Sequence, residues 1–295
     1  MAAEASSASN ELQAEAFKQL YPEQYYAKFI NSSLRPDGRP LDGARATTIG
    51  LNPIGTADSS ALVKIGETTA MAGIKLGISA LEEEPALESL LAVGVEMAAF
   101  SSSDARPGRP SPAAQCAQQQ VKDVLLGGAL DAQQLQLKEG QAWKLFLDIY
   151  VLDADGCIFD VCLLAAVAAL LALKLPKAEI DEEGKVVVGS ADSEPGPKED
   201  LLHLSYVPIA TTCAIYEGRL ITDPDAEEEA LAASLITSVV DGAGRVIGLL
   251  KAGRTAAASA KTLQQCIQAA TLRHKELSTV LNQSLQAIGL PLQDR

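Results

Sequence analysis

One stretch in the middle of the chain constrains the fold most, because a strand pattern, a tight turn and an unbroken apolar run follow one another there. Apolar side chains alternate with other residues from Trp143 to Val151, which predicts a strand with one buried face. A turn at residues 153–156 leads to the apolar run 161–173. This run is shorter than the roughly 20 apolar residues that span a bilayer, and Asp160 stands directly before it. The pattern therefore predicts a helix buried in the core of a globular protein.

The rest of the first half carries short strand signals and one helix signal. Gly-containing breaks separate three predicted strands, at residues 47–51, 60–65 and 69–76. The acidic segment 82–96 is assigned neither to a helix nor to a strand. Ser111 and Pro112 predict the N-cap and the first residue of a helix that Gly127–Gly128 end.

The second half repeats this outline. Its predicted strands are residues 207–216, 219–222, 231–240 and 245–250, the last two forming a hairpin around residues 241–244. A long helix from about Ser259 closes the chain. Its apolar stripe consists of Leu263, Ile267, Ala270, His274, Leu277, Leu281 and Ile288. Two halves, each with a sheet followed by a helix, predict an α+β or α/β fold with internal duplication.

The two remaining segments are the N-terminus and a polar stretch in the middle of the chain. Disorder is expected up to about Asn10, followed by two short helices, of which Pro22 opens the second. Their apolar side, for docking on the body, is formed by Phe17, Leu20, Tyr25 and Phe29. Residues 180–200 are rich in Asp, Glu, Gly and Pro and predict a linker or excursion between the halves.

Net charge and the cysteine and histidine content bear on two possible functions, RNA binding and zinc binding. The chain has 295 residues, 47% hydrophobic, and a net charge of −14. A broad RNA-binding surface is normally basic, so any RNA contact here must be local or supported by a partner. The five cysteines lack a C-x-x-C spacing and there are two histidines, which predicts no zinc site. Reduced, buried thiols in an intracellular protein are expected.

Three groups of polar residues are candidates for a site. Arg106 and Arg109 lie in one Pro/Gly loop and Arg35 and Arg39 in another, where guanidinium groups can clamp phosphate or be ordinary solvated or salt-bridged side chains. The acidic run 223–229 could hold Mg²⁺, although a solvated face is the favoured interpretation. On the closing helix, His274 is interpreted as a satisfied core histidine. No nucleotide-binding or nucleophile motif occurs.

Several phrases together resemble the RNase PH family. Its landmarks are matched by residues 35–39 (RPDGR), 56–69 (TADSSALVKIGETT), 153–156 (DADG) and 223–229 (DPDAEEE). Residues 272–276 (LRHKE) are similar to a phrase in exosome ring subunits of the ribosomal RNA-processing protein 43 type. The resemblance covers roughly residues 25–285.

The resemblance implies an α+β fold of two β-α-β lobes, related to the ribosomal protein S5 domain 2-like fold. The corresponding domains are an N-terminal tail (1–33), a first lobe (34–179), a linker (180–204) and a second lobe with the C-terminal helix (205–295). It also implies a six-membered ring with other RNase PH-like exosome subunits, cap proteins on one side and RNA threaded through the channel. The implied location is nucleus, nucleolus and cytoplasm, with no membrane attachment and no cofactor.

The same resemblance implies lost chemistry. Active family members bind phosphate with a Ser or Thr and an Arg shortly after the Asp-Gly turn, where this chain has Ile158 and Phe159. They place a catalytic Asp where it has Leu235, and Glu229 stands where the acidic phrase usually ends in Asp. Loss of anion binding and of the acid would remove both positioning and charge stabilisation. No catalytic residue is therefore assigned.

Three hypotheses remain open. The favoured one is a non-catalytic ring subunit, in which Arg106 and Arg109 are the RNA-binding candidates because their loop aligns with the region where relatives contact RNA, although Asp104 replaces the first arginine. The second is an active phosphorolytic exoribonuclease using Asp223, Glu227 and Glu229 with Mg²⁺. The third is an interaction module outside the exosome.

Overall fold

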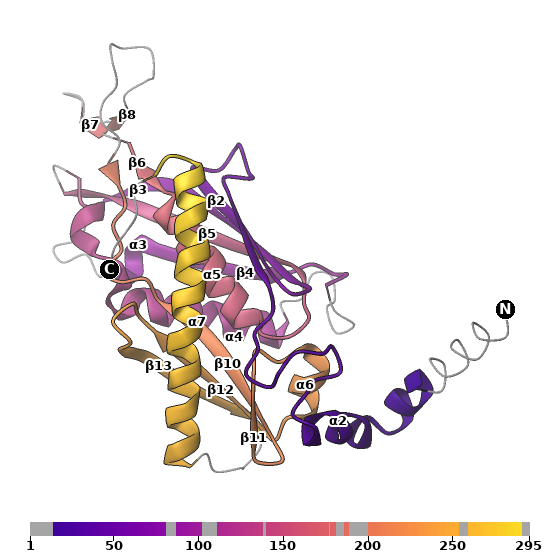
Figure 1. Ribbon diagram of the computed structural model, residues 1–295. Coiled ribbons are helices and arrows are strands. Elements are labelled where there is room, and N and C mark those ends of the chain that lie inside the picture. Colours follow the sequence, from indigo (N-terminus) through magenta and orange to yellow (C-terminus); the bar gives the residue numbers. More distant parts are fainter. Residues whose placement is uncertain are drawn as a thin grey trace.

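The computed structural model describes residues 14–80, 87–101, 111–137, 140–176, 178–180, 186–188, 200–253 and 259–290. Two sheets, with helix α5 (Ile158–Leu171) between them and the long helix α7 (Ala260–Ala287) along one side, make up the body (Figure 1). Among these residues, no helix combines the length and the apolar character that crossing a bilayer requires.

The first sheet contains five strands in the order β1-β2-β3-β5-β4. Their bounds are β1 Thr47–Leu51, β2 Ser59–Ile65, β3 Thr68–Ala80, β4 Leu91–Met97 and β5 Gln141–Asp153. Only β4 runs parallel to its neighbour, β5. All four predicted strands of this half are confirmed. The unassigned acidic segment ends in the short helix α3 (Leu87–Leu90) and strand β4, while residues 82–86 lie outside the described part.

The apolar run 161–173 lies almost entirely in helix α5, and the position of this helix explains why the run is apolar throughout. It packs against β2 and β3 of the first sheet and against β10 of the second, so every residue from Phe159 to Leu171 is buried. A helix covered on all sides needs apolar residues around its whole circumference. The predicted buried helix is confirmed, and it starts three residues earlier than the apolar run, at Ile158.

Helix α4 (Pro112–Val124) begins as its sequence predicts. The Ser111 hydroxyl accepts the N–H of Ala114 at 3.0 Å, which satisfies one of the free amides of the first turn. A π-helical turn, η1 (Leu125–Ala129), and a short 3-10 helix, η2 (Ala132–Leu135), follow. Within η1 the positive φ of Gly128 (110°) bends the chain, a conformation that glycine adopts without strain.

The second sheet is antiparallel, in the order β11-β10-β12-β13. Its strands are β10 Ile209–Tyr216, β11 Arg219–Thr222, β12 Ser234–Val240 and β13 Val246–Gly253. The predicted hairpin is confirmed, with the Asp241 carboxylate accepting the N–H groups of Ala243 and Arg245. The predicted start of its first strand at residue 231 is wrong, because helix α6 (Ala226–Leu231) occupies that position.

The closing helix α7 is capped by Ser259, whose hydroxyl accepts the N–H of Thr262 at 3.1 Å. Along its stripe, Leu277, Leu281 and Leu285 join the apolar cluster that also contains Leu147 of the first sheet. Ile288 does not belong to the stripe, because it follows the helix and is 40% exposed. The core thus contains side chains from both halves, and the predicted domain limits stay a prediction.

At the N-terminus, residues 14–20 are helical and α2 (Pro22–Asn31) follows. Its docking face differs from the predicted one: Tyr26 and Ile30 are buried against the second sheet, whereas Leu20 is 72% exposed. The expected disorder before Asn10 lies outside the described residues. Around the predicted linker the structure describes two small strand pairs, β6 (Lys174–Leu175) with β9 (Asp200–Leu201) and β7 (Ala178–Ile180) with β8 (Val186–Val188), of which β6 and most of β7 precede residue 180.

Candidate functional site

Four phrases that are far apart in the sequence meet in one buried polar cluster, which we call the motif junction. It consists of Arg35, Arg45, Thr68, the turn 155–157 and the segment 223–229. The Thr68 hydroxyl donates to the Gly156 carbonyl at 2.8 Å and accepts the N–H of Asp155 at 3.0 Å. The Asp155 carboxylate in turn accepts the N–H of Ala226 at 3.2 Å. The junction therefore joins the first sheet to the start of α6.

Arg35, from the RPDGR phrase, uses all of its guanidinium N–H groups within the motif junction. It is 1% exposed, and its guanidinium forms a two-pronged pair with the Glu228 carboxylate. Its remaining N–H groups donate to the carbonyls of Gly43, Thr222 and Asp223. Since all five donors have partners within the chain, none is left for phosphate. The salt-bridged interpretation of this arginine is confirmed.

Arg45 forms the second ion pair of the junction, with Asp223. The Nη2–Oδ1 distance is 2.7 Å, and the backbone N–H of Arg45 donates to Oδ2 at 2.6 Å. Burial alone would raise the pKa of the Asp223 carboxyl, but the hydrogen bonds and charge of Arg45 hold that pKa below its ordinary value. Asp223 is thus an ionised structural partner, held in a left-handed backbone conformation with φ +52°.

Gly156 of the phrase 153–156 lies directly against the backbone of the phrase 223–229. Its φ is +77°, and a Cβ there would lie 2.8 Å from the Pro224 carbonyl oxygen. Next to it, the N–H of Cys157 donates to the Glu229 carboxylate at 2.8 Å. Burial raises the pKa of Glu229 and that of the Cys157 thiol. A buried thiol with a raised pKa is a poor nucleophile at neutral pH.

The acidic run 223–229 is not a solvated face, and that favoured interpretation is wrong. Asp223 and Glu228 are buried, and Asp225 and Glu228 cap helix α6 reciprocally. Glu227 accepts the Tyr26 hydroxyl and pairs with Lys18 at 2.6 Å, which ties α6 to the N-terminal helices. The charges are accommodated because each buried carboxylate has its own donor.

The same partners weigh against a magnesium site. Asp223, Glu227 and Glu229 bind three different donors, and among the described residues no group of three or more metal-type side chains converges. The oxygen atoms that a hard cation would need point to arginine, tyrosine and backbone N–H groups instead.

Three apolar residues stand where active family members are expected to have phosphate-binding and catalytic residues, and they lie in two separate apolar clusters. Ile158 and Phe159 form the first turn of α5 and pack in the main core. Leu235 lies on β12 and packs against the cluster that contains Tyr26 and Ile30 of α2. Ile158 and Phe159, which are adjacent in the chain, thus pack in one apolar cluster and Leu235 packs in another.

The RNA-binding candidates Arg106 and Arg109, together with Asp104, lie outside the described residues. Arg39 is placed at the edge of the motif junction, where it pairs with Asp37 and lies 3.8 Å from the Asp223 carboxylate. Pairing on both sides leaves Arg39 a structural role in this arrangement.

The sequence interpretation missed three residues of the junction region. Arg45 lies outside every family phrase, and Thr68 lies in one (56–69) but was not singled out, because their partners are 178 and 88 positions away. Asp160, noted only as a boundary, is buried and accepts both the N–H and the hydroxyl of Thr212 on β10. Its place directly before an apolar run was the one available signal.

The structure shows whether His274 and the five cysteines are buried, as the sequence predicted. His274 is buried between the Val207 carbonyl (3.0 Å) and the Ser278 hydroxyl (3.1 Å), which confirms a satisfied core histidine. All five cysteines are free thiols. Four are buried as expected, but Cys116 is exposed on α4, so the expectation of burial is wrong for that residue.

Comparison with known proteins agrees with the fold. The model of the 3′ exoribonuclease family, domain 1, matches residues 43–176, and that of domain 2 matches residues 206–272. An Aeropyrum pernix protein, exosome complex component Rrp42, is 33% identical over 77% of this chain and 82% of its own length. The Schizosaccharomyces pombe exosome complex component rrp43 is 32% identical over 86% and 93%, respectively.

Solved structures give the same result. A chain of the Archaeoglobus fulgidus exosome with RNA bound to the active site superposes with a TM-score of 0.74 and 25% identity, covering 87% of this chain and 96% of its own. A chain of an archaeal exosome core superposes with a TM-score of 0.69. The predicted RNase PH-like α+β fold is confirmed, and this chain belongs to the RNase PH family of 3′ exoribonuclease-type proteins.

Proposed function

We propose that this chain is a non-catalytic subunit of the RNA exosome ring. It would supply subunit interfaces and part of the channel wall for 3′-to-5′ RNA processing and degradation, including rRNA maturation and mRNA turnover, in the nucleus, nucleolus and cytoplasm. Its partners would be other RNase PH-like ring subunits, cap proteins and the threaded RNA. The exosome names of relatives that match over 82% and 93% of their own lengths support this role.

The observation that carries the non-catalytic part is the apolar packing of Ile158, Phe159 and Leu235. Phosphorolysis requires a cationic or hydrogen-bonding cradle for phosphate and an acid for the leaving oxygen. At these positions the chain offers hydrocarbon side chains instead. The neighbouring carboxylates and the arginines Arg35 and Arg45 neutralise one another, so they form structural pairs in place of a substrate site.

Reconstitution tests both parts of the proposal. The full chain is coexpressed with candidate RNase PH-like ring subunits, and the mass of the purified assembly is measured. Each ring and the isolated chain are then incubated with a single-stranded RNA and inorganic phosphate, with a catalytic RNase PH-family enzyme as the positive control. We expect a ring of defined mass and no nucleoside diphosphate from the isolated chain. A stable monomer that joins no ring would refute the ring role.

The alternative, a phosphate-dependent exoribonuclease activity, is measured by the release of nucleoside diphosphates. If the isolated chain releases nucleoside diphosphates only when phosphate is present, the non-catalytic part is wrong. Loss of that release in both Glu227→Gln and Glu229→Gln, with retained folding, would then assign the chemistry to the acidic run. Glu227 suits this test because its side chain is 53% exposed and its replacement leaves the core intact.

A further inference from the structure

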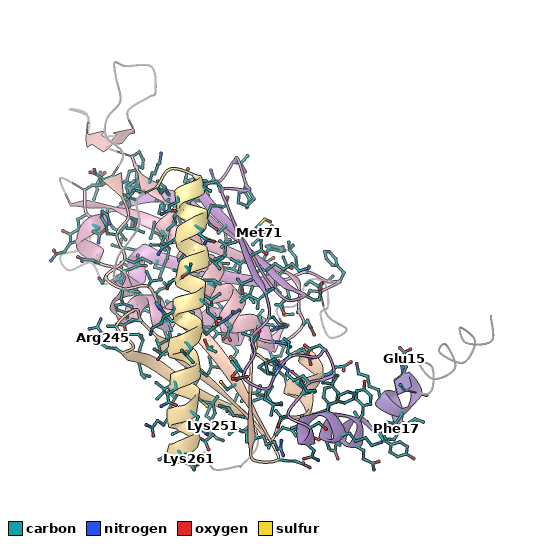
Figure 2. The ribbon with its side chains drawn as sticks, in the orientation of Figure 1. Glu15, Phe17, Met71, Arg245, Lys251 and Lys261 are labelled. Carbon is teal, nitrogen blue, oxygen red and sulfur yellow. The ribbon has the colours of Figure 1, made fainter. Side chains whose placement is uncertain are left out.

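Two of the buried thiols lie against each other under helix α7. Cys213 is on strand β10, and Cys266 is near the start of α7. Both side chains are fully buried, and together with Ile236 they form a small apolar cluster that is separate from the main core. This end of the helix, marked by Lys261 in Figure 2, packs on the second sheet. The two cysteines therefore face each other across the contact between a strand and a helix.

The two sulfur atoms are joined by a hydrogen bond, in which the Cys213 thiol donates to the Cys266 sulfur. This bond lowers the pKa of Cys266, although burial opposes the shift. The same bond, together with burial, raises the pKa of Cys213 well above its ordinary value. Cys266 is therefore the thiol that ionises more readily, and Cys213 stands beside it as a second thiol. A reactive thiol next to a resolving thiol is the arrangement of cysteine pairs that oxidise reversibly.

The other three cysteines have different surroundings. The Cys157 thiol donates to the Pro224 carbonyl at 3.3 Å, and Cys162 packs in the main apolar cluster. Burial raises the pKa of both thiols, that of Cys162 to about 12. Cys116 is exposed on α4. These residues allow the effect of the Cys213–Cys266 contact to be separated from the effects of burial and of exposure.

An open groove lies directly beside the thiol pair. Its volume is about 960 Å³, and it is lined by side chains of α7 and β11 and by the loop 40–44. Thr222 belongs to this lining, and its side chain hydrogen-bonds with the Cys213 thiol. Leu220 and Ala269 also line the groove and pack against the cluster that contains both thiols. One layer of side chains therefore separates the thiols from a space that a small solute can enter.

We propose that Cys213 and Cys266 form an oxidation site, at which a hydroperoxide converts the two thiols into a disulfide. The disulfide joins β10 to α7 covalently and fixes the wall of the groove that α7 contributes. The inference does not rest on the proposed ring role, because both thiols belong to one chain and react within it. Failure of the chain to join a ring would therefore leave the oxidation site untouched.

With hydrogen peroxide the reaction has two steps. The Cys266 sulfur attacks one peroxide oxygen, the O–O bond breaks, and Cys266 becomes a sulfenic acid. The released hydroxide takes the proton of the Cys266 thiol and leaves as water. The Cys213 sulfur then attacks the sulfenic sulfur, and the S–S bond forms as the S–O bond breaks. The sulfenic hydroxyl takes the Cys213 proton and leaves as a second water, so the two thiols lose two electrons and the peroxide gains them.

The alternative is that the two cysteines serve only as small apolar side chains, as buried cysteines often do. Packing alone requires neither contact between the sulfur atoms nor a groove behind their cover. The contact matters because a disulfide needs sulfur atoms about 2.05 Å apart, so thiols that already touch have little distance to close. The groove matters because a buried thiol reacts only with an oxidant that can reach it.

Mass measurement of the folded full chain tests the proposal. Cys116→Ser is the working protein, because the exposed Cys116 thiol would otherwise link two chains. The protein is treated with hydrogen peroxide, its remaining thiols are alkylated, and the intact chain and its proteolytic peptides are weighed. We expect the intact mass to fall by two hydrogen atoms. One linked peptide should contain Cys213 and Cys266, and dithiothreitol should separate it.

Matched variants separate the thiol pair from burial as such. Cys213→Ala and Cys266→Ala should each abolish the disulfide. Cys162→Ala removes an equally buried thiol from α5 and should keep it. The inference is overturned if the linked peptide joins another pair, or if none forms at a peroxide dose that oxidises Cys116 of the wild type completely. This result needs no variant of the pair, so it decides the question even where an alanine variant does not fold.

Urea unfolding provides a second measurement. A disulfide between β10 and α7 restricts the unfolded chain, so the oxidised protein should unfold at a higher urea concentration than the reduced one. Dithiothreitol should return the midpoint to its starting value, and peroxide should leave the midpoint of folded Cys266→Ala unchanged. A midpoint that falls on oxidation would show that the two thiols are oxidised separately instead of joined, and would contradict the inference.

Discussion

Arg45 and Asp223, 178 positions apart in the sequence, form a buried ion pair with 2.7 Å between Nη2 and Oδ1. Arg45 comes directly before the first sheet, and Asp223 follows the shortest strand of the second. The pair therefore links the two sheets next to the 155–157 turn, which precedes helix α5. Because both side chains are removed from water, each charge is compensated chiefly by the other, while Asp155 (3.5 Å from Arg45) and Arg39 (3.8 Å from Asp223) are the more distant partners.

Breaking this pair should destabilise the whole fold. We expect Asp223→Asn to lower the free energy of unfolding by about 3–5 kcal/mol, since it leaves the buried Arg45 guanidinium with only the more distant, partly exposed Asp155 carboxylate (3.5 Å) as counter-charge. Urea denaturation at neutral pH measures the loss. Glu67→Gln is the control, because the Lys64–Glu67 pair (3.0 Å) is exposed and should cost about 1 kcal/mol or less. Equal effects of the two substitutions would contradict a structural role for Asp223.

Gly156 allows a test of the close contact at the motif junction. We expect Gly156→Ala to be the more damaging of two alanine substitutions at the same φ of +77°, the other being Gly218→Ala. Both variants bear the cost of a left-handed alanine, about 1 kcal/mol. Only the Cβ at residue 156 also meets the backbone of Pro224 and Ala226, whereas nothing lies within 4 Å of that at residue 218.

The comparison is made by thermal and urea unfolding of the two variants side by side. Overpacking of this kind adds about 1–3 kcal/mol, so the melting temperature of Gly156→Ala should fall clearly below that of Gly218→Ala. Indistinguishable unfolding curves would mean that the 155–157 turn and the 223–226 turn can separate at little cost.

The elements that were predicted from sequence are those whose signals are local. Helix α5 follows from an uninterrupted apolar run, β5 from alternation, the start of α4 from Ser111 as an N-cap, and α7 from its apolar stripe. Each of these signals depends on residues within a few positions, which is the range over which backbone geometry sets side-chain direction.

The motif junction was not predictable in this way. The acidic run 223–229 looked like a solvated face because its composition is strongly charged, and only the fold brings Arg35 and Arg45 to it. For α2, the residues one position after the predicted ones are buried: Tyr26 and Ile30 instead of Tyr25 and Phe29. A ten-residue helix with aromatic residues on several faces leaves its buried face to the surface it meets.

The RNA-binding candidates can be tested in the assembled ring. We expect the double variant Arg106→Ala with Arg109→Ala to bind a single-stranded RNA more weakly than the wild-type ring at low salt. The dependence of affinity on salt should also become shallower, by about 0.7 in the logarithmic slope for each phosphate that the variant ring no longer neutralises. Lys64→Ala, an exposed cation elsewhere on the chain, serves as the control. An unchanged slope would remove both arginines from the RNA path.

Asp160 should make stability depend on pH. Burial, helped by the charges of Asp223 and Glu229, raises the pKa of this carboxyl from an ordinary 3.8 to about 7, although the hydrogen bonds from Thr212 oppose the shift. The folded state therefore holds the proton more tightly than the unfolded state does. Its stabilising contribution is complete below 3.8 and is lost as the pH rises through about 7.

Asp160→Asn isolates this effect, because asparagine keeps an acceptor for the Thr212 N–H but cannot ionise. We expect the unfolding free energy of the wild type, relative to Asp160→Asn, to fall by up to about 1.4 kcal/mol per pH unit in this interval. Above pH 7 the difference should level off, since Asp160 is then ionised in both states. Urea unfolding of both proteins at a series of pH values measures it. A relative stability that rises with pH would show that the Thr212 hydrogen bonds outweigh burial and keep Asp160 ionised in the fold.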